Sequence, residues 1–203
     1  MNKRSGINSK KRILNAALKV FSEYGYKGAS MRMIAAAARI SIGGVYLYFT
    51  NKEELYLTLI KERFDDFLGM VKTSVSTIED PVKAISSFII MYLGYARSHK
   101  ELILTQGREH GFVFAIDIKR EFFKEQRGII EGIVTRGIQS GVFTECNVKE
   151  VTKIIMGTLR GFILSIVVDP DNLFSPEECC RFMLGGLLKR TDGADGGKAE
   201  KNQ

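Results

Sequence analysis

The stretch Ser41-Ile42-Gly43-Gly44, followed closely by two tyrosines, carries the residue types of this 203-residue chain that point most directly to binding chemistry. It reads as a helix of about eight residues with two glycines, each costing about 1 kcal/mol relative to alanine. A helix start rich in serine and glycine can bring backbone N–H groups close to a phosphate, or lie deep in a groove without side chains intervening. The alternative is that the glycines only permit close helix packing.

The flanking sequence predicts the elements that hold this stretch. Apolar residues at helical spacing predict a helix from about Met31 to Ala38, with Ser30 as its N-cap. Arg39 and Ile40 then form a tight turn, and Ser41 caps the next helix. The buried side of that helix is expected to consist of Val45, Tyr46 and Phe49. Two helices this short, joined by so brief a turn, predict a helix-turn-helix.

A second start signal follows directly in Thr50-Asn51-Lys52-Glu53. We expect a capping box in which the Thr50 hydroxyl accepts the Glu53 N–H while the Glu53 carboxylate reaches back to Thr50. The long helix that begins there is the natural connector to a second domain.

The pattern resembles the DNA-binding signature of the tetracycline-repressor (TetR) family over about the first 55 residues. The matching residues are Ile13-Leu14, Ala16-Ala17, Phe21, Glu23, Gly25-Tyr26, Ser30-Met31, Ile34-Ala35, Arg39-Ile40-Ser41, Gly43, Tyr46, Tyr48-Phe49 and Lys52-Glu53-Glu54-Leu55. The resemblance implies that DNA is contacted by Ser30, Ser41, Ile42, Gly43, Tyr46, Tyr48 and Lys52. Three residues depart from the family pattern: Arg39 replaces the usual turn glycine, Ala29 replaces a common hydroxyl residue, and Met33 stands where an acidic residue is frequent. A left-handed non-glycine residue costs only about 1 to 2 kcal/mol, so we expect the turn to survive.

The distribution of charge along the chain also favours DNA binding by the N-terminal segment. Residues 1–52 contain ten Lys or Arg and one acid, Glu23, a balance of +9, whereas the whole chain carries +7. A basic excess on the helix-turn-helix segment is typical of proteins that displace counterions from DNA phosphates. Binding to an anionic membrane is the alternative. Residues 1–8 are expected to form a basic arm, and Ser9 to cap the first helix, which should stop at Gly25.

The sequence offers little support for a catalytic site or a metal site. No nucleophile, base and orienting acid can be proposed together, and His99, His110 and Cys146 lack zinc-ligand spacing. We therefore expect no enzyme activity, no metal and no cofactor. Cys179 and Cys180 are neighbours on a predicted helix, which favours core or interface residues over a redox pair. The polar N-terminus predicts no signal peptide, and the apolar segment 154–168 falls short of a membrane span and contains an arginine, so a cytoplasmic location is expected.

The remaining sequence predicts further helices. Asp80-Pro81 begins one that ends near Ser98, and Lys100 to Gly107 forms a short one. A long helix runs from about Phe114 to Ser140. Cap signals at Asn147 and at Ser175-Pro176 begin helices to about Val168 and Arg190.

Two functional regions are predicted in this part. In the long helix the apolar stripe is interrupted by Gln126, which either pairs with a backbone group or meets a ligand. Candidate residues for an apolar effector site, which could equally be plain core, are Phe67, Met91, Tyr92, Tyr95, Gln106, Phe112, Phe122, Phe123, Gln126 and Phe162. The helix after Asn147 is apolar nearly all round, so one face needs a partner. The last two helices resemble the pair with which family members dimerise, and the candidate interface residues are Gly157, Gly161, Phe182, Met183 and Leu187.

The sequence thus predicts an all-α protein of about nine helices. It comprises a helix-turn-helix domain (1–52), a larger helical ligand-binding and dimerisation domain (53–190) and a disordered tail (191–203). The resemblance implies a regulator of transcription, usually a repressor, that binds a palindromic double-stranded DNA operator as a homodimer and is released by a small effector. A DNA-organising or division-linked protein without an inducer is the alternative, and an enzyme built on the helical domain is a second rival. The sequence names neither the effector nor the operator.

Overall fold

A computed structural model describes residues 3–101, 103–104 and 115–189. Eight labelled helices lie within these ranges: α1 Lys3–Gly28, α2 Met31–Ala38, α3 Ile42–Tyr46, α4 Lys52–Ser76, α5 Pro81–Ser98, α7 Ile116–Gln139, α8 Val148–Val168 and α9 Pro176–Leu187. Residues 100, 101, 103 and 104 are also helical, whereas the rest of the predicted helix from Lys100 to Gly107 lies outside the described residues. The described part contains no β-strand, only an isolated bridge between Phe143 and Leu188. The fold is therefore all-α, as predicted.

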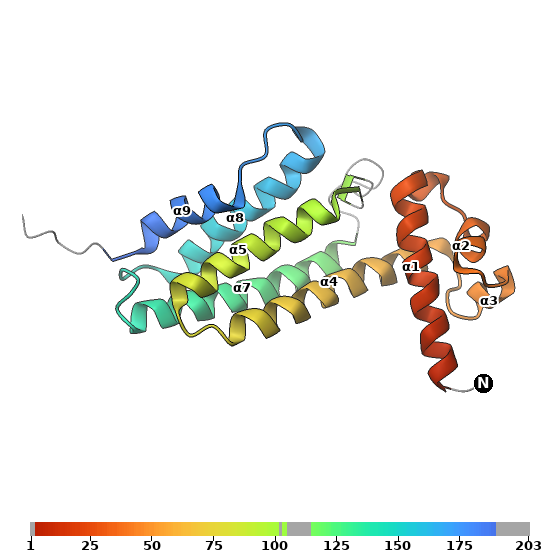
Figure 1. Cartoon of the computed structure of the whole chain (residues 1–203), viewed down its shortest axis with the longest axis horizontal. Coiled ribbons are helices and arrows are strands. Elements are labelled where there is room, and N and C mark those ends of the chain that lie inside the picture. Colours follow the sequence, from red (N-terminus) through yellow and green to blue (C-terminus); the bar gives the residue numbers. More distant parts are fainter. Residues whose placement is uncertain (1–2, 102, 105–114, 190–203) are drawn as a thin grey trace, which may run out of the picture.

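The helices form two bodies joined by α4 (Figure 1). Helices α1, α2 and α3 gather at one end, around a core that includes Ile13, Phe21 and Ile34. Helices α5, α7, α8 and α9 pack beside the remainder of α4, around a second core that includes Phe88 and Leu159.

Helix α4 contributes to both cores, which explains how the two bodies are connected. Its first half places Leu55, Tyr56, Leu59 and Ile60 in the first core, and its second half begins the second core with Phe67. Phe64 packs against both. A displacement of α4 is therefore transmitted to the helix-turn-helix, because no flexible linker intervenes.

Most helix starts follow the predicted caps. The side chains of Ser30, Ser41, Asp80, Asn147 and Ser175 each accept a backbone N–H from the first turn of the following helix. These bonds satisfy N–H groups that the helix itself leaves without partners.

Two predicted starts are wrong. The cap of α4 is Asn51, which accepts the Glu54 N–H at 2.8 Å, while the Glu54 carboxylate accepts from both Thr50 N and Thr50 Oγ1. The capping box is thus shifted by one residue, because asparagine competes successfully for the cap. Hydrogen bonds from the Thr50 hydroxyl, and then from its N–H, lower the pKa of Glu54.

Helix α1 also departs from expectation, since it begins at Lys3 and not after Ser9. The segment contains no proline, so nothing in the backbone prevents the extension. The predicted stop at Gly25 corresponds to a break with φ 70° and ψ 174°, after which one further turn continues to Gly28.

Helix α8 is the only described helix long and apolar enough to cross a bilayer by length and composition. It packs one face in the second core, where Ile155, Leu159 and Phe162 are buried. At the side of this face, next to α7, lies Arg160, which is exposed. This distribution is that of a helix in a bundle.

Candidate nucleic-acid interface and interior polar site

The turn between α2 and α3 is held by an arginine from α1. Arg39 has φ 53° and ψ 47°, the left-handed conformation expected where the family pattern has glycine. Arg12 Nη2 donates to the carbonyl oxygens of Ala38 at 2.7 Å and of Arg39 at 3.3 Å. These bonds help to offset the cost of the left-handed residue. The sequence analysis did not select Arg12, because its contact with Ala38 joins residues 26 positions apart.

The two capping serines lie at the surface beside this turn. Ser30 Oγ accepts the Met33 N–H at 3.2 Å, and Ser41 Oγ accepts the Gly44 N–H at 3.1 Å. Each hydroxyl retains its own O–H as a donor. Both predicted contact residues are thus fixed in orientation and able to donate to an approaching oxygen.

The two glycines of α3 have different surroundings. A Cβ added to Gly44 would lie 2.6 Å from Ile40 Cγ2, so this glycine permits close packing within the helix-turn-helix. A Cβ added to Gly43 would meet no heavy atom within 4 Å. The packing explanation therefore holds for Gly44 only, and the bare backbone at Gly43 faces open space.

Exposure along α3 corrects one prediction and adds one residue. Val45 and Phe49 are buried as expected, but Tyr46 is 50% exposed and does not belong to the buried side. Because Val45 and Phe49 already fill the core side, the Tyr46 ring turns outward. Leu47, which sequence reasoning did not select, is 75% exposed, and Ile42 is 41% exposed. The only sequence signal for Leu47 is that it is an apolar residue between two tyrosines.

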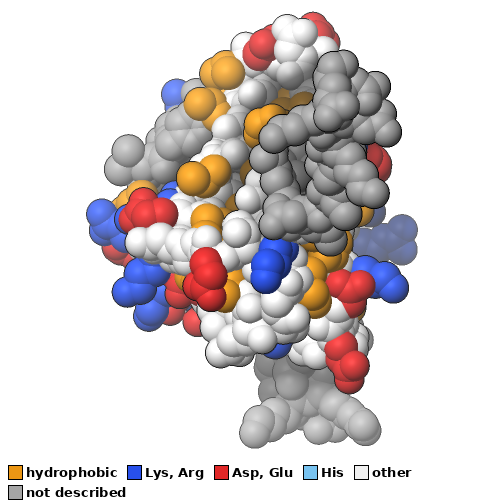
Figure 2. All heavy atoms as spheres, turned by 90° about the vertical axis from the view of Figure 1, so that its left-hand side faces the viewer, with side chains coloured by type: hydrophobic (Ala, Val, Ile, Leu, Met, Phe, Trp, Pro, Cys, Tyr) orange, Lys and Arg blue, Asp and Glu red, His pale blue; other side chains and the backbone are white. Residues whose placement is uncertain are grey.

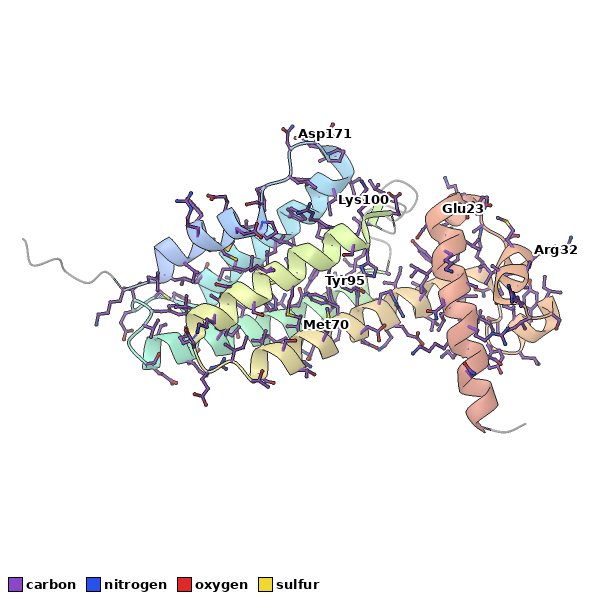
Figure 3. All side chains as sticks on the ribbon, in the orientation of Figure 1. Glu23, Arg32, Met70, Tyr95, Lys100 and Asp171 are labelled. Atoms are coloured by element: carbon purple, nitrogen blue, oxygen red, sulfur yellow. The ribbon has the colours of Figure 1, made fainter. Side chains whose placement is uncertain are left out.

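Tyr48 is half-buried and packs against the first core. On α2, the exposed side chain of Arg32 points away from the body at the outer edge of the helix-turn-helix (Figure 3). It is one of the basic groups available beside α3.

Lys52 is engaged within the protein. Its Nζ donates to the carbonyl oxygens of Tyr26 at 2.6 Å and Ala29 at 2.8 Å, and it lies 4.4 Å from the centroid of the Tyr26 ring. The ammonium group thereby ties the start of α4 to the junction of α1 and α2. One of its three N–H donors remains for another partner.

The helical domain contains a connected group of aromatic rings, which we call the aromatic network. Neighbouring centroids lie between 4.8 and 5.9 Å apart. Its members are Phe67, Tyr92, Tyr95, Phe122 and Phe123. Five of the predicted effector residues are therefore brought together.

The other predicted effector residues lie elsewhere. Met91 is half-buried at the edge of the second core, and Phe162 is buried against Phe174. Gln106 and Phe112 lie outside the described residues.

Gln126 is fully buried one helical turn after Phe122, and among the residues that the structure describes neither its Nε2 nor its Oε1 has a hydrogen-bond partner. The prediction that it lies on the buried face is confirmed, but the backbone partner that was the alternative to a ligand is not found. A buried amide without partners costs about 1 to 3 kcal/mol, so this side chain is a candidate for contact with a polar atom of a bound molecule.

A cation lies at the border of the aromatic network. Arg160 places its guanidinium 4.2 Å from the Phe123 ring centroid and has no acidic partner within the part of the chain that is described. Burial raises the pKa of Tyr92, and the charge of Arg160 acts in the opposite direction. Burial also raises the pKa of Tyr95 to about 12, so its hydroxyl stays neutral and donates to the Arg63 carbonyl at 2.9 Å.

The exposed faces of α8 and α9 form an apolar surface. A groove of about 570 Å³ lies between them, and its lining includes Ile154, Phe182 and Met183. Phe182 is 86% exposed, and a Cβ at Gly157 or at Gly161 would meet nothing within 4 Å. Figure 2 shows the end of the helical domain opposite the helix-turn-helix, where orange side chains reach the surface between charged ones.

Of the remaining predicted interface residues, Met183 is half-buried and Leu187 is buried within the same groove. Cys179 also lines the groove, and both neighbouring cysteines are buried. Burial raises their thiol pKa values.

Comparison with known proteins agrees with this geometry. Residues 13–59 match the family described as bacterial regulatory proteins, tetR family. The chain is 30% identical over 160 residues to the fatty acid metabolism regulator protein of Bacillus subtilis (strain 168), covering 77% of this chain and 82% of that protein. The crystal structure of the transcriptional regulator FadR from Bacillus subtilis in complex with stearoyl-CoA superposes with a TM-score of 0.72 and 23% identity, covering 87% of this chain and 98% of the other. A TetR transcription regulator from Haloarcula marismortui gives a TM-score of 0.78 at 18% identity, covering 90% and 99%.

Proposed function

Because this chain belongs to the TetR family of bacterial regulatory proteins, we propose that it is a repressor which binds an inverted-repeat operator as a dimer and releases it when an effector fills the helical domain. Regulation of transcription through DNA and a small-molecule ligand follows from the family. The operator symmetry, the dimer, the effector class and the contact residues are our proposal. The observation that carries it is Gly43, whose bare backbone faces open space in the basic part of the chain.

We assign the DNA face to the surface of α3 and its neighbours. The face comprises Ser30, Ser41, Ile42, Gly43, Tyr46, Tyr48 and Lys52. The free O–H groups of the two serines and the outward ring of Tyr46 support this assignment. A recognition helix in each of two adjacent major grooves requires half-sites about one helical turn, roughly 34 to 36 Å, or a multiple of it apart.

A second copy of the chain is the proposed partner of the α8–α9 surface. An aromatic side chain as exposed as Phe182, beside an apolar groove, is typical of an interface core. Gly157 and Gly161, one turn apart, allow the backbones of two α8 helices to approach closely. We divide the chain into a DNA-binding domain (1–52) and a dimerising helical domain (53–190). Because the proposed target is chromosomal DNA, the location that we propose is the cytoplasm.

For the effector we propose a long-chain acyl compound, free or as a thioester. Such a molecule needs an apolar channel for its chain and a few polar groups for its head. The aromatic network provides the apolar surface. Gln126 provides a neutral polar contact and Arg160 a cationic one, and within the described ranges of the chain Gln126 has no hydrogen-bond partner and Arg160 no acidic partner. The related FadR of Bacillus subtilis binds stearoyl-CoA, which supports this class.

The route from effector to DNA runs through α7 and α4. Phe122 of α7 stacks on Phe64 of α4 with centroids 4.0 Å apart, and Phe64 contacts both cores. At the start of α7, Ala115 and Ile118 pack against the helix-turn-helix core. We propose that α7 has two placements in the domain, one with effector and one without. An effector that binds one placement more tightly than the other therefore changes the placement of the helix-turn-helix.

The proposed function is tested by selecting bound sequences from random duplex DNA and determining the mass of the complex on the selected duplex. We expect an inverted repeat bound by an even number of protomers. Salt-sensitive binding with no enriched sequence would favour a DNA-organising protein. An enriched sequence without symmetry, bound by a monomer, would contradict the dimer.

The effector class is tested on the selected operator. Acyl-CoA thioesters and fatty acids of increasing chain length are expected to raise the Tm of the protein and to dissociate the complex. Aromatic and quaternary ammonium compounds serve as the comparison set. Stabilisation by that set alone would contradict the acyl proposal and leave the operator result intact.

A further inference from the structure

The exposed face of α3 is apolar. At 100° per residue, Ile42, Tyr46, Gly43 and Leu47 fall within one arc of about 140°, whereas the buried Val45 lies outside this arc. The exposed fractions are 41% for Ile42, 50% for Tyr46 and 75% for Leu47. The arc that faces outward therefore presents two aliphatic side chains, one glycine and one phenol.

This arc lacks the side chains that usually read bases by hydrogen bonds. Between residues 41 and 48 there is no Arg, Lys, Asn, Gln, Asp or Glu. The side chains able to hydrogen-bond there are Ser41, Tyr46 and Tyr48, and each offers a single hydroxyl group. Bidentate recognition of guanine or adenine needs Arg, Lys, Asn or Gln, so the helix itself cannot provide it.

Leu47 and Ile42 can make another kind of base contact. Among the base edges in the major groove, thymine alone presents a methyl group, and apolar side chains recognise it. An exposed leucine gains from burial there, whereas in the free protein it lies in water. The surrounding segment carries the +9 balance that draws it to DNA, which argues for DNA as the occupant of this apolar arc.

We propose that Leu47 and Ile42 are specificity-determining residues that read the 5-methyl groups of thymines in each half-site. This proposal rests on the proposed function, since it assumes that α3 enters the major groove. The glycine between them permits the approach, because no Cβ at residue 43 holds the helix away from the base edges.

The test replaces each thymidine of the selected operator, one position at a time, by deoxyuridine. This change removes only the methyl group and keeps base pairing. Transfer of one methyl-sized group is worth a factor of about four in affinity, so a symmetrical replacement in both half-sites should weaken binding about 15-fold. We expect this at one or two positions of each half-site, and no effect at the others.

The Leu47→Ala variant connects the effect to its residue. It should weaken binding to the thymidine operator and lose the deoxyuridine effect at one position, while Ile42→Ala loses it at another. The variants should keep the Tm of the parent, because both side chains are exposed. Met70→Ala, at a residue of α4 that is 44% exposed and lies away from the helix-turn-helix, is the control and should keep both operator affinity and deoxyuridine sensitivity (Figure 3).

The possible failures differ in meaning. Specific binding to the selected operator with no deoxyuridine effect at any position would overturn the thymine proposal and leave the proposed function standing. A deoxyuridine effect that persists unchanged in Leu47→Ala and Ile42→Ala would overturn the assignment to these residues. Failure to enrich any sequence would remove the proposed function and this inference together.

Discussion

The substitution Gly43→Ala should raise stability and lower DNA affinity at the same time. In the free protein an added Cβ meets no atom within 4 Å, so alanine fits without a clash. Alanine is favoured over glycine in a helix by up to about 1 kcal/mol, which in a chain of this size raises the Tm by about 2 to 4 °C. The same methyl group would stand between the backbone of α3 and the base edges.

The cost at the DNA follows from the loss of close approach. Withdrawal of the helix by even a fraction of a methyl radius weakens several contacts, and a loss of about 1.4 kcal/mol corresponds to a tenfold weaker complex. We therefore expect at least tenfold weaker binding of the selected operator by Gly43→Ala. Thermal unfolding measures the first effect, and fluorescence anisotropy of labelled operator measures the second.

Gly44→Ala is the matched control, since its Cβ would lie 2.6 Å from Ile40 Cγ2. It should lower both the Tm and the operator affinity, because overpacking costs about 1 to 3 kcal/mol. A stabilised Gly43→Ala variant with unchanged operator affinity would refute the reasoning, since it would show that the backbone of α3 does not closely approach DNA.

Three further substitutions test the roles of Lys52, Gln126 and Phe182. Lys52→Ala removes two charge-assisted hydrogen bonds and should destabilise the protein by about 2 to 3 kcal/mol in thermal or denaturant unfolding. If Lys52 also contacts one phosphate, the salt slope of DNA binding falls by about one; a lower affinity with an unchanged slope would contradict that contact. Gln126→Leu should stabilise the effector-free protein by about 1 to 2 kcal/mol and weaken acyl binding at least several-fold; unaltered acyl affinity by calorimetry would exclude Gln126 as a ligand contact. Phe182→Asp should convert a dimer into a folded monomer with much weaker operator binding. Ile90→Asp, at a residue of α5 that is 45% exposed, is the control and should not. A Phe182→Asp variant that sediments as a dimer would contradict the proposed interface.

The helix-turn-helix could be predicted in detail because its signals are local. Ser30 and Ser41 are caps whose oxygens act within three residues, and the left-handed turn follows from the position of Arg39 between two helical patterns. The spacing of Ile34 and Ala38 sets the buried face in the same way.

The features that could not be predicted depend on contacts between residues distant in sequence, or on competition between neighbouring residues for the same role. The Lys52 ammonium binds carbonyl groups 23 and 26 residues earlier, and no pattern in the sequence reveals such a contact. Asn51 and Thr50 are neighbours and both are good caps, so residue type alone does not show that Asn51 is the one used. The outward position of Tyr46 follows from the filling of the core side by Val45 and Phe49.

The helical domain could be predicted from the sequence only in part. The burial of Gln126 could be predicted because the apolar stripe of α7 continues on both sides of it. Its lack of a hydrogen-bond partner among the described residues could not be predicted, since that depends on which side chains of other helices surround it. The identity of an effector depends further on the shape and polarity of the space that those helices leave.

We propose that the chain couples operator binding to effector binding. This coupling is tested most directly by measuring operator affinity with and without saturating acyl ligand, and acyl affinity with and without operator. We expect operator affinity to fall at least fivefold and acyl affinity to fall by the same factor, because coupling between two sites is reciprocal. An acyl ligand that binds tightly and leaves operator affinity unchanged would contradict the account.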